Sequence, residues 1–180
     1  LLAENHLLPT ASGAGIWYNA LRFLRDQSKM PPPNADIFNT LTRSSLIALA
    51  LMPDSEEKAA MLRAFQTYYG RNIAMDSPGQ TGGFKADGCI FHHWGHYPGY
   101  GFPAMNGAAL ACDMLDKTPW AMPEAARAKL GLALKSAYIY TNPRLGQPAT
   151  NPETATALCG RHPFGESGLR GVATSYRRMA

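Results

Sequence analysis

The sequence predicts an all-α fold, and three observations support this. Apolar residues recur at intervals of three and four positions in several segments, which is the spacing of one face of a helix. The 14 prolines and 17 glycines gather between those segments, and the alternation of apolar and polar residues that marks strands is weak. We therefore expect about six helices joined by two long loops, and helix pairs stacked around a ring or solenoid suit this pattern.

Three helices are expected in the first part of the chain. The first covers residues 14–26 and ends before a run of three prolines, which cannot continue a helix. The second covers residues 36–52. The third starts with Asp54 as N-cap and Glu57 three residues later, the arrangement of a capping box, and Gly70 is expected to end it.

A glycine-rich segment over residues 77–102 follows these helices. Loops of this length inside a compact domain are generally functional or disordered. This one contains three of the five histidines and many aromatic residues, so an ordered functional loop is expected. Helices resume over residues 103–115 and again with Pro123 in the first turn. A last helix is expected near Ser167, after a second irregular segment.

The composition is that of an ordinary globular domain, with 46% hydrophobic and 17% charged residues. No apolar run approaches the roughly 20 residues that a membrane-spanning helix needs, so no membrane partner is expected. The net charge of +4 suits an acidic ligand, whereas the lack of any run of five basic residues argues against nucleic acid. Three cysteines, an odd and small number, argue against a disulfide scaffold.

The first residues of the sequence contain no recognisable targeting signal. It begins with Leu1 rather than Met, and residues 1–9 lack the charged start and apolar core of a signal peptide. We therefore expect residues 1–180 to be a single, partial domain from a longer protein.

The densest group of reactive side chains lies in residues 87–104. His93 and Tyr100 are seven positions apart, and Pro98 and Gly99 between them argue against a regular helix. A Pro-Gly turn can instead bring both side chains to one cleft. Such a pair suits proton abstraction beside a carboxylate, because imidazole accepts a proton near neutral pH and a phenol can accept or donate one.

A tyrosine that acts as a base needs a nearby cation, because a free phenol has a pKa of about 10. Arg161 is the candidate, since it also lies in an irregular segment. Any one of the histidines could equally be a structural residue with a satisfied hydrogen bond. Their clustering favours a functional interpretation.

A metal site is the alternative for the same loop. Cys89, His92, His93 and His96 are side chains that bind transition metals. Their spacing matches no zinc finger or ribbon, and the H-E-x-x-H motif is absent. We therefore expect no metal ligand and no cofactor.

Other motifs are absent, and the tryptophans add one candidate. Neither a phosphate-binding loop, a dinucleotide-binding glycine motif nor a nucleophile elbow occurs in a suitable context. Aromatic faces can pack on the apolar face of a sugar ring. A core position is expected for Trp17, whereas Trp94 in the loop suits either the core or a sugar.

Four segments closely resemble the chondroitin sulfate ABC lyases of polysaccharide lyase family eight. The active-site loop of that family is matched by Asp87-Gly88, His93, residues 97–100 and residues 102–104. Three further segments match in the same order along the chain, namely residues 38–43, 140–146 and 160–164. The resemblance covers roughly residues 35–180, and the order of four motifs makes it more specific than any one of them.

The resemblance implies a fold and a set of site residues. The fold is an incomplete α/α toroid, which in the family is followed by large antiparallel β domains that are expected to complete the site. His93 and Tyr100 match the catalytic histidine and tyrosine, and Arg161 matches an arginine that contacts the tyrosine and the substrate. The expected substrate-binding residues are Asn39, His92, Trp94 and His162.

The resemblance also implies a reaction and a partner. Members of the family cut chondroitin and dermatan sulfates, and in some cases hyaluronan, by β-elimination to 4,5-unsaturated products. The expected partner is therefore an acidic polysaccharide, met in the periplasm or outside a bacterial cell. Three rival readings stay open: a glycan-binding or scaffold remnant without turnover, a lyase for another uronate polymer such as alginate or heparin-like chains, and a metal-dependent hydrolase.

Overall fold

Four α-helices make up most of the described structure, which is a computed structural model that describes Leu24, residues 34–142, residues 156–157 and Arg177. A π-helical segment, η2 (Ile37–Leu41), leads directly into the first of them. The α-helices are α2 (Thr42–Leu51), α3 (Glu56–Ala74), α4 (Pro98–Leu115) and α5 (Glu124–Tyr140). The all-α prediction is confirmed. The first and last predicted helices lie outside the described residues, apart from Leu24 and Arg177, which are both helical.

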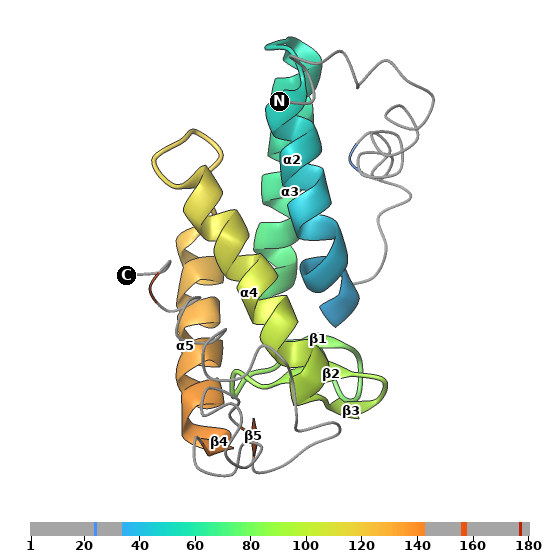
Figure 1. Ribbon diagram of the computed structural model, residues 1–180, viewed down its shortest axis with the longest axis vertical. Helices are drawn as coiled ribbons and strands as arrows, with labels where there is room; N and C mark the ends of the chain where they lie inside the picture. Colours follow the sequence, from blue (N-terminus) through green and yellow to red (C-terminus); the bar gives the residue numbers. More distant parts are fainter. Residues whose placement is uncertain (1–23, 25–33, 143–155, 158–176, 178–180) are drawn as a thin grey trace, which may run out of the picture.

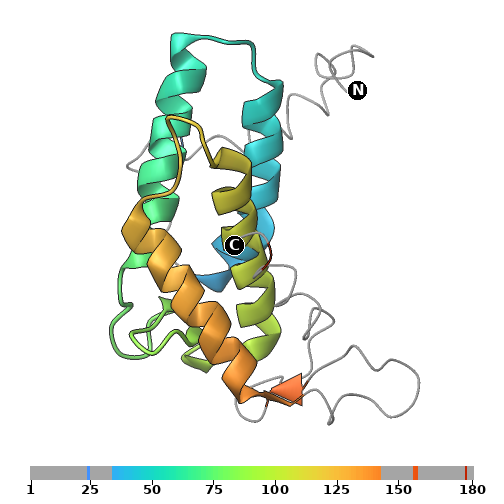
Figure 2. The ribbon, with the colours of Figure 1, turned by 90° about the vertical axis from the view of Figure 1, so that its left-hand side faces the viewer.

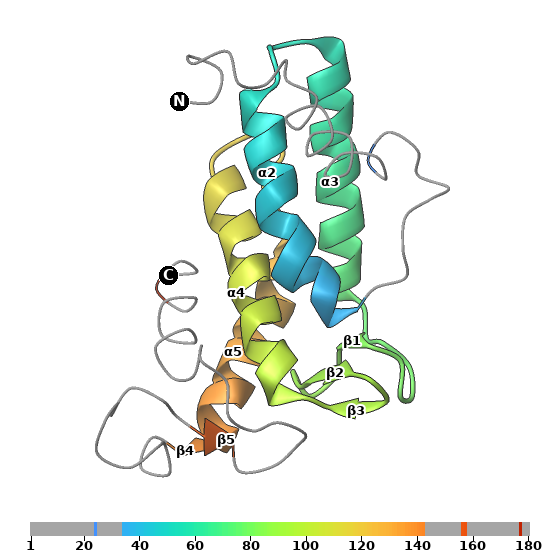
Figure 3. The ribbon, with the colours of Figure 1, turned by 45° about the vertical axis from the view of Figure 1, so that its right-hand side comes forward.

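The helices form two stacked hairpins. The pairs α2–α3 and α4–α5 lie against each other, with α4 on α2 and η2, and α5 on α3 (Figures 1 and 3). Figure 2 shows that the turns of both hairpins lie at the same end of the molecule, opposite the short strands. Within the described residues, none of the helices is both long and apolar enough to span a membrane.

A small sheet closes the other end of the helices. It consists of β1 (Gly83–Phe84), β2 (Ile90–His92) and β3 (Gly95–His96), joined in antiparallel order. A second antiparallel pair, β4 (Thr141–Asn142) and β5 (Thr156–Ala157), follows α5. These strands were not predicted, because two or three residues are too few to show an alternating pattern.

Helix α3 differs at both ends from the prediction. Its N-cap is Ser55, whose Oγ accepts a hydrogen bond from the backbone N–H of Lys58 at 3.1 Å. Asp54 instead accepts from the Nζ of Lys58. Gly70 does not end the helix but lies inside it, where a Cβ would come within 2.8 Å of Pro123. The glycine is therefore needed for close packing against the start of α5.

Helix α4 starts five residues earlier than predicted. Pro98 occupies its first turn, where a missing N–H costs nothing, and Pro103 lies inside the helix. His93 and Tyr100 do not share a regular helix, as expected, but the glycine-rich segment gives way to helix at residue 98 rather than after residue 102. As a result, Tyr100 lies in the first turn of α4 rather than in a loop.

Helix α4 crosses η2 at very short range. A Cβ added to Gly107 of α4 would lie 1.8 Å from the carbonyl oxygen of Phe38, so the two backbones touch. The Phe38 ring is fully buried and makes edge contacts with Tyr69 of α3 and Phe84 of β1, at centroid distances of 5.8 and 5.3 Å. Phe38 thus joins both helix hairpins to the sheet.

We expect Gly107→Ala to lower the free energy of unfolding of the helical domain by about 3 kcal/mol or more, because the methyl group has no room. The measurement is denaturant unfolding followed by circular dichroism. Gly131→Ala is the matched control, since Gly131 is also helical and has open space around its Cβ position. That variant should gain up to about 1 kcal/mol. Equal stability of the two variants would contradict the contact.

Candidate active site

The β2–β3 hairpin turns through two residues in the left-handed region. His92 pairs with Gly95, and the residues between them, His93 and Trp94, have φ values of 46° and 71°. Two positive φ values between paired strands are those of a type I′ turn, which favours Asn-Gly. Bulky side chains at both positions are strained, and such strain is commonly found at functional sites.

The turn carries both side chains into solvent. His93 is exposed, and Trp94 is 77% exposed. Since both side chains are exposed, packing in the core does not explain why bulky residues occupy these strained positions. For Trp94, the core position that the sequence left open is excluded, and the exposed indole face is free to meet a ligand.

Tyr100 reaches the same place from the first turn of α4. Its backbone N–H donates to the carbonyl of Tyr97 at 3.0 Å, and Gly101 donates to the same oxygen at 2.8 Å. A Cβ on Gly101 would lie 3.4 Å from Ile90, so the start of α4 packs directly on β2. This packing brings half-buried Tyr100 beside the hairpin.

Four rings gather where the hairpin meets α4. The His93 and Tyr100 rings are 5.9 Å apart, edge to face. The His92 ring is 3.8 Å from the His93 ring and 4.5 Å from the Tyr100 ring, and Tyr97 packs on Tyr100 at 4.7 Å. The pair predicted from the sequence is thus brought together, although its catalytic role stays a prediction.

The other predicted site residues have different surroundings. His92 is only 5% exposed, so its ring offers little surface to a substrate, and its substrate-binding role stays a prediction. Asn39 is exposed on η2. Arg161 and His162 lie outside the described residues, and their roles stay predictions.

A groove of about 490 Å³ runs between α4 and the η2–α2 segment. Asn39 and Arg43, four positions apart, line one wall, and Asn106 lies on the other. Its remaining lining is mainly apolar: Phe38, Ile47, Pro103, Gly107, Leu110 and Met114. Arg43 was not among the site residues predicted from the sequence. Its spacing of four positions from Asn39 in a predicted helix does indicate that the two side chains lie on the same face.

Buried Lys85 anchors the sheet. Its Nζ donates to the carbonyls of Ser77, Gly79 and Thr81 at 2.8, 2.9 and 2.6 Å, and lies 4.5 Å from the centre of the Phe91 ring. Burial lowers the pKa of Lys85, an effect that the nearby carboxylate of Asp87 partly offsets. The ammonium group thus fixes the loop before β1 and the strand that leads to His93.

His96 links the sheet to α5. Its ring makes an edge contact with Tyr140 at 4.9 Å, and burial lowers its pKa, with a smaller opposing effect from Asp87. Among the residues that the structure describes, no three His, Cys, Asp or Glu side chains are placed to hold a metal ion. The set of Cys89 and three histidines considered from the sequence therefore does not converge in this geometry.

The family follows from a match over the whole chain. Residues 1–180 match the sequence model of the family described as "Lyase, catalytic". The chain belongs to this family. The predicted resemblance is confirmed, and with it the assignment of the two helix hairpins to an incomplete α/α toroid.

Curated relatives of this lyase catalytic domain are much longer. The chain is 33% identical over 181 residues to a chondroitin sulfate ABC endolyase of Proteus vulgaris, covering 99% of this chain and 17% of that protein. It is 33% identical over 166 residues to a chondroitin sulfate ABC exolyase of the same organism, covering 92% of this chain and 16% of that protein. A chondroitin sulfate ABC exolyase of Bacteroides thetaiotaomicron is 32% identical over 182 residues, and the match covers 100% of this chain and 17% of that protein. The chain thus spans about a sixth of the length of these relatives.

We expect Trp94→Gly to raise the free energy of unfolding by about 1 kcal/mol, because glycine adopts the left-handed conformation without a steric cost. Thermal unfolding of the lyase domain measures this. Trp120→Gly is the control, since Trp120 packs against the core and its loss should destabilise the domain. A lower stability of Trp94→Gly would show that the turn is not strained.

Proposed function

We propose that the protein is a polysaccharide lyase that cleaves uronate-containing glycosaminoglycans by β-elimination. The proposed substrates are chondroitin and dermatan sulfate, with hyaluronan as a further substrate. The observation that carries the proposal is the exposed His93 beside Tyr100, at 5.9 Å, within a lyase catalytic domain. The names of the three relatives support the substrate class, and the net charge of +4 suits a polyanion.

The proposed reaction removes the proton on C5 of the uronate and expels the oxygen on C4. Hydrogen bonds that neutralise the uronate carboxylate acidify the C5 proton. Tyr100, as the ionised phenol, takes this proton when the sugar is glucuronate, and His93 takes it from the opposite face when the sugar is iduronate. The C4–O4 bond then breaks and a double bond forms between C4 and C5. Tyr100 protonates the leaving oxygen, with the proton that it took from glucuronate or, when His93 is the base, with the proton of its neutral phenol.

Other residues would bind and tune the site. Arg161 would hold Tyr100 and stabilise its ionised form, as a cation beside a phenol does. Trp94 offers an exposed aromatic face to a sugar ring, and Asn39 and His162 would contact the polymer. The remaining domains of a longer protein would complete the cleft, in a periplasmic or secreted enzyme that meets such polymers outside the cytoplasm.

We expect Tyr100→Phe and His93→Ala in the full-length protein to lower turnover about 10²- to 10⁴-fold, since each removes a group that moves a proton. Ultraviolet absorbance of the unsaturated product measures the rate on chondroitin sulfate, dermatan sulfate, hyaluronan and alginate. His93→Ala should affect dermatan sulfate most. Tyr138→Phe is the matched control, because Tyr138 is 68% exposed on α5, outside the ring cluster.

Each rival function gives a different result in this assay. Wild-type activity in Tyr100→Phe would remove the proposed mechanism. Binding of chondroitin sulfate without any product would favour a glycan-binding remnant, and product from alginate or heparin-like chains alone would favour another uronate lyase. Loss of activity with a chelator, restored by a metal, would favour a metal-dependent hydrolase.

A further inference from the structure

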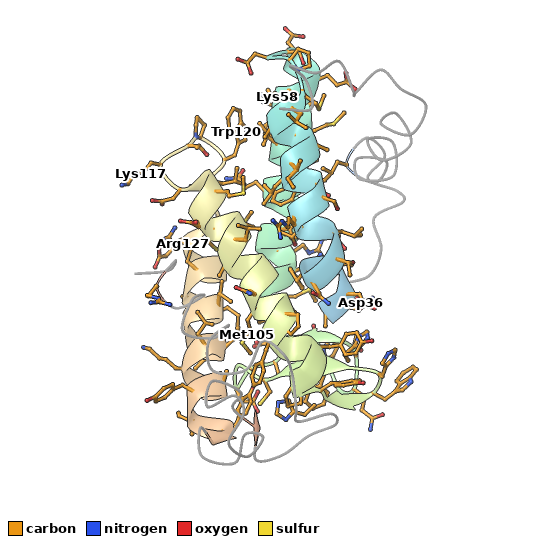
Figure 4. All side chains as sticks on the ribbon, viewed as in Figure 1. Asp36, Lys58, Met105, Lys117, Trp120 and Arg127 are labelled. Carbon is orange, nitrogen blue, oxygen red and sulfur yellow. The ribbon has the colours of Figure 1, made fainter. Side chains whose placement is uncertain are left out.

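An acidic residue lies behind the ring cluster. The Oδ2 of Asp36 is 3.5 Å from the Nε2 of His92, and the Asp36 side chain is 45% exposed whereas His92 is buried. The two residues come from distant parts of the chain, the start of the η2 helical segment and strand β2. Figure 4 shows Asp36 at the end of that segment that faces the sheet.

His92 is placed to transmit an effect from Asp36 to the proposed catalytic pair. One edge of its ring turns Nε2 toward the carboxylate, while the ring itself contacts His93 at 3.8 Å and Tyr100 at 4.5 Å. A rotation of this imidazole would therefore disturb both neighbours. The separation of 3.5 Å is an ion-pair distance rather than that of a formed hydrogen bond, and the carboxylate attracts the N–H edge of the imidazole and so favours the ring orientation that points Nε2 at Asp36.

Asp36 is itself held firmly. The Oδ1 of Asn34 accepts from the backbone N–H groups of Asp36 and Ile37, at 2.8 and 3.3 Å, and so caps the helical segment. The hydroxyl of Thr40 donates to the Asp36 carbonyl at 2.6 Å. These contacts fix the Asp36 backbone, and with it the point from which the carboxylate reaches toward His92.

We propose that Asp36 is a positioning residue for the lyase reaction, which acts through His92 to hold His93 and Tyr100 in their reactive geometry. This inference rests on the proposed function. Neither Asp36 nor His92 touches the reacting atoms in this scheme. Their loss should therefore lower kcat and leave KM nearly unchanged, because misplacement of reactive groups by about 1 Å can cost about 100-fold in rate.

The test uses the full-length protein and the absorbance assay on chondroitin sulfate. Asp36→Asn should lower kcat about 10- to 100-fold with little change in KM, and Asp36→Glu, which keeps the carboxylate, should recover part of the rate. In the background of His92→Phe, which keeps a ring but not Nε2, Asp36→Asn should have no further effect. Asp113→Asn is the matched control, because Asp113 is an exposed acid 13 residues beyond Tyr100 on α4.

Three results would overturn the inference: an unchanged kcat in Asp36→Asn, a rise in KM alone, or additive effects of the Asp36 and His92 changes. A crystal structure of full-length Asp36→Asn gives a readout without turnover, since the His92 and Tyr100 rings should be displaced. If the wild-type protein forms no unsaturated product, the proposed function fails, and the ring positions still decide whether Asp36 positions His92.

Discussion

The contact between Gly107 and the carbonyl of Phe38 determines how α4, η2 and the small sheet lie relative to one another. It lets α4 pass backbone to backbone over η2, closer than any side chain would permit. Tyr100 is seven residues before this crossing, about 10 Å along the helix, so the crossing fixes its position. The same Phe38 ring packs on β1, which ties the crossing to the sheet that presents His93.

The hairpin reaches the site by a second, independent set of anchors. The Nζ of Lys85 donates to the carbonyl oxygens of Ser77, Gly79 and Thr81, in the segment that precedes β1. Gly88 packs so closely on α5 that a Cβ would lie 2.9 Å from the Cα of Ala133, and the Ser136 hydroxyl donates to the carbonyl of Asp87. His93 and Tyr100 are therefore held by different elements that meet at one point, and local strain at His93 is tolerated because both sides are fixed.

Local patterns in the sequence were sufficient for the helices but not for their crossings. Three- and four-residue spacing identified α2, α3 and α5, whose apolar faces are buried. Gly70 was predicted to end a helix because glycine is common at that position. The residue that requires a glycine there, Pro123, is far along the chain and cannot be recognised from local sequence. Likewise, nothing local indicates that Asp36 meets His92. The His93-Tyr100 pair was found from chemistry and family motifs, whereas the type I′ turn was not, because His-Trp is an unusual pair at those positions.

These constraints together support one picture of the site, in which a strained turn and a helix start present an imidazole and a phenol to a sugar acid. The most direct measurement is a crystal structure of the full-length Tyr100→Phe protein with a bound chondroitin tetrasaccharide. We expect a uronate C5 within about 4 Å of the ring at position 100, with the His93 ring on the opposite face and Trp94 against a neighbouring sugar. An oligosaccharide bound elsewhere, with no contact to either ring, would contradict this account.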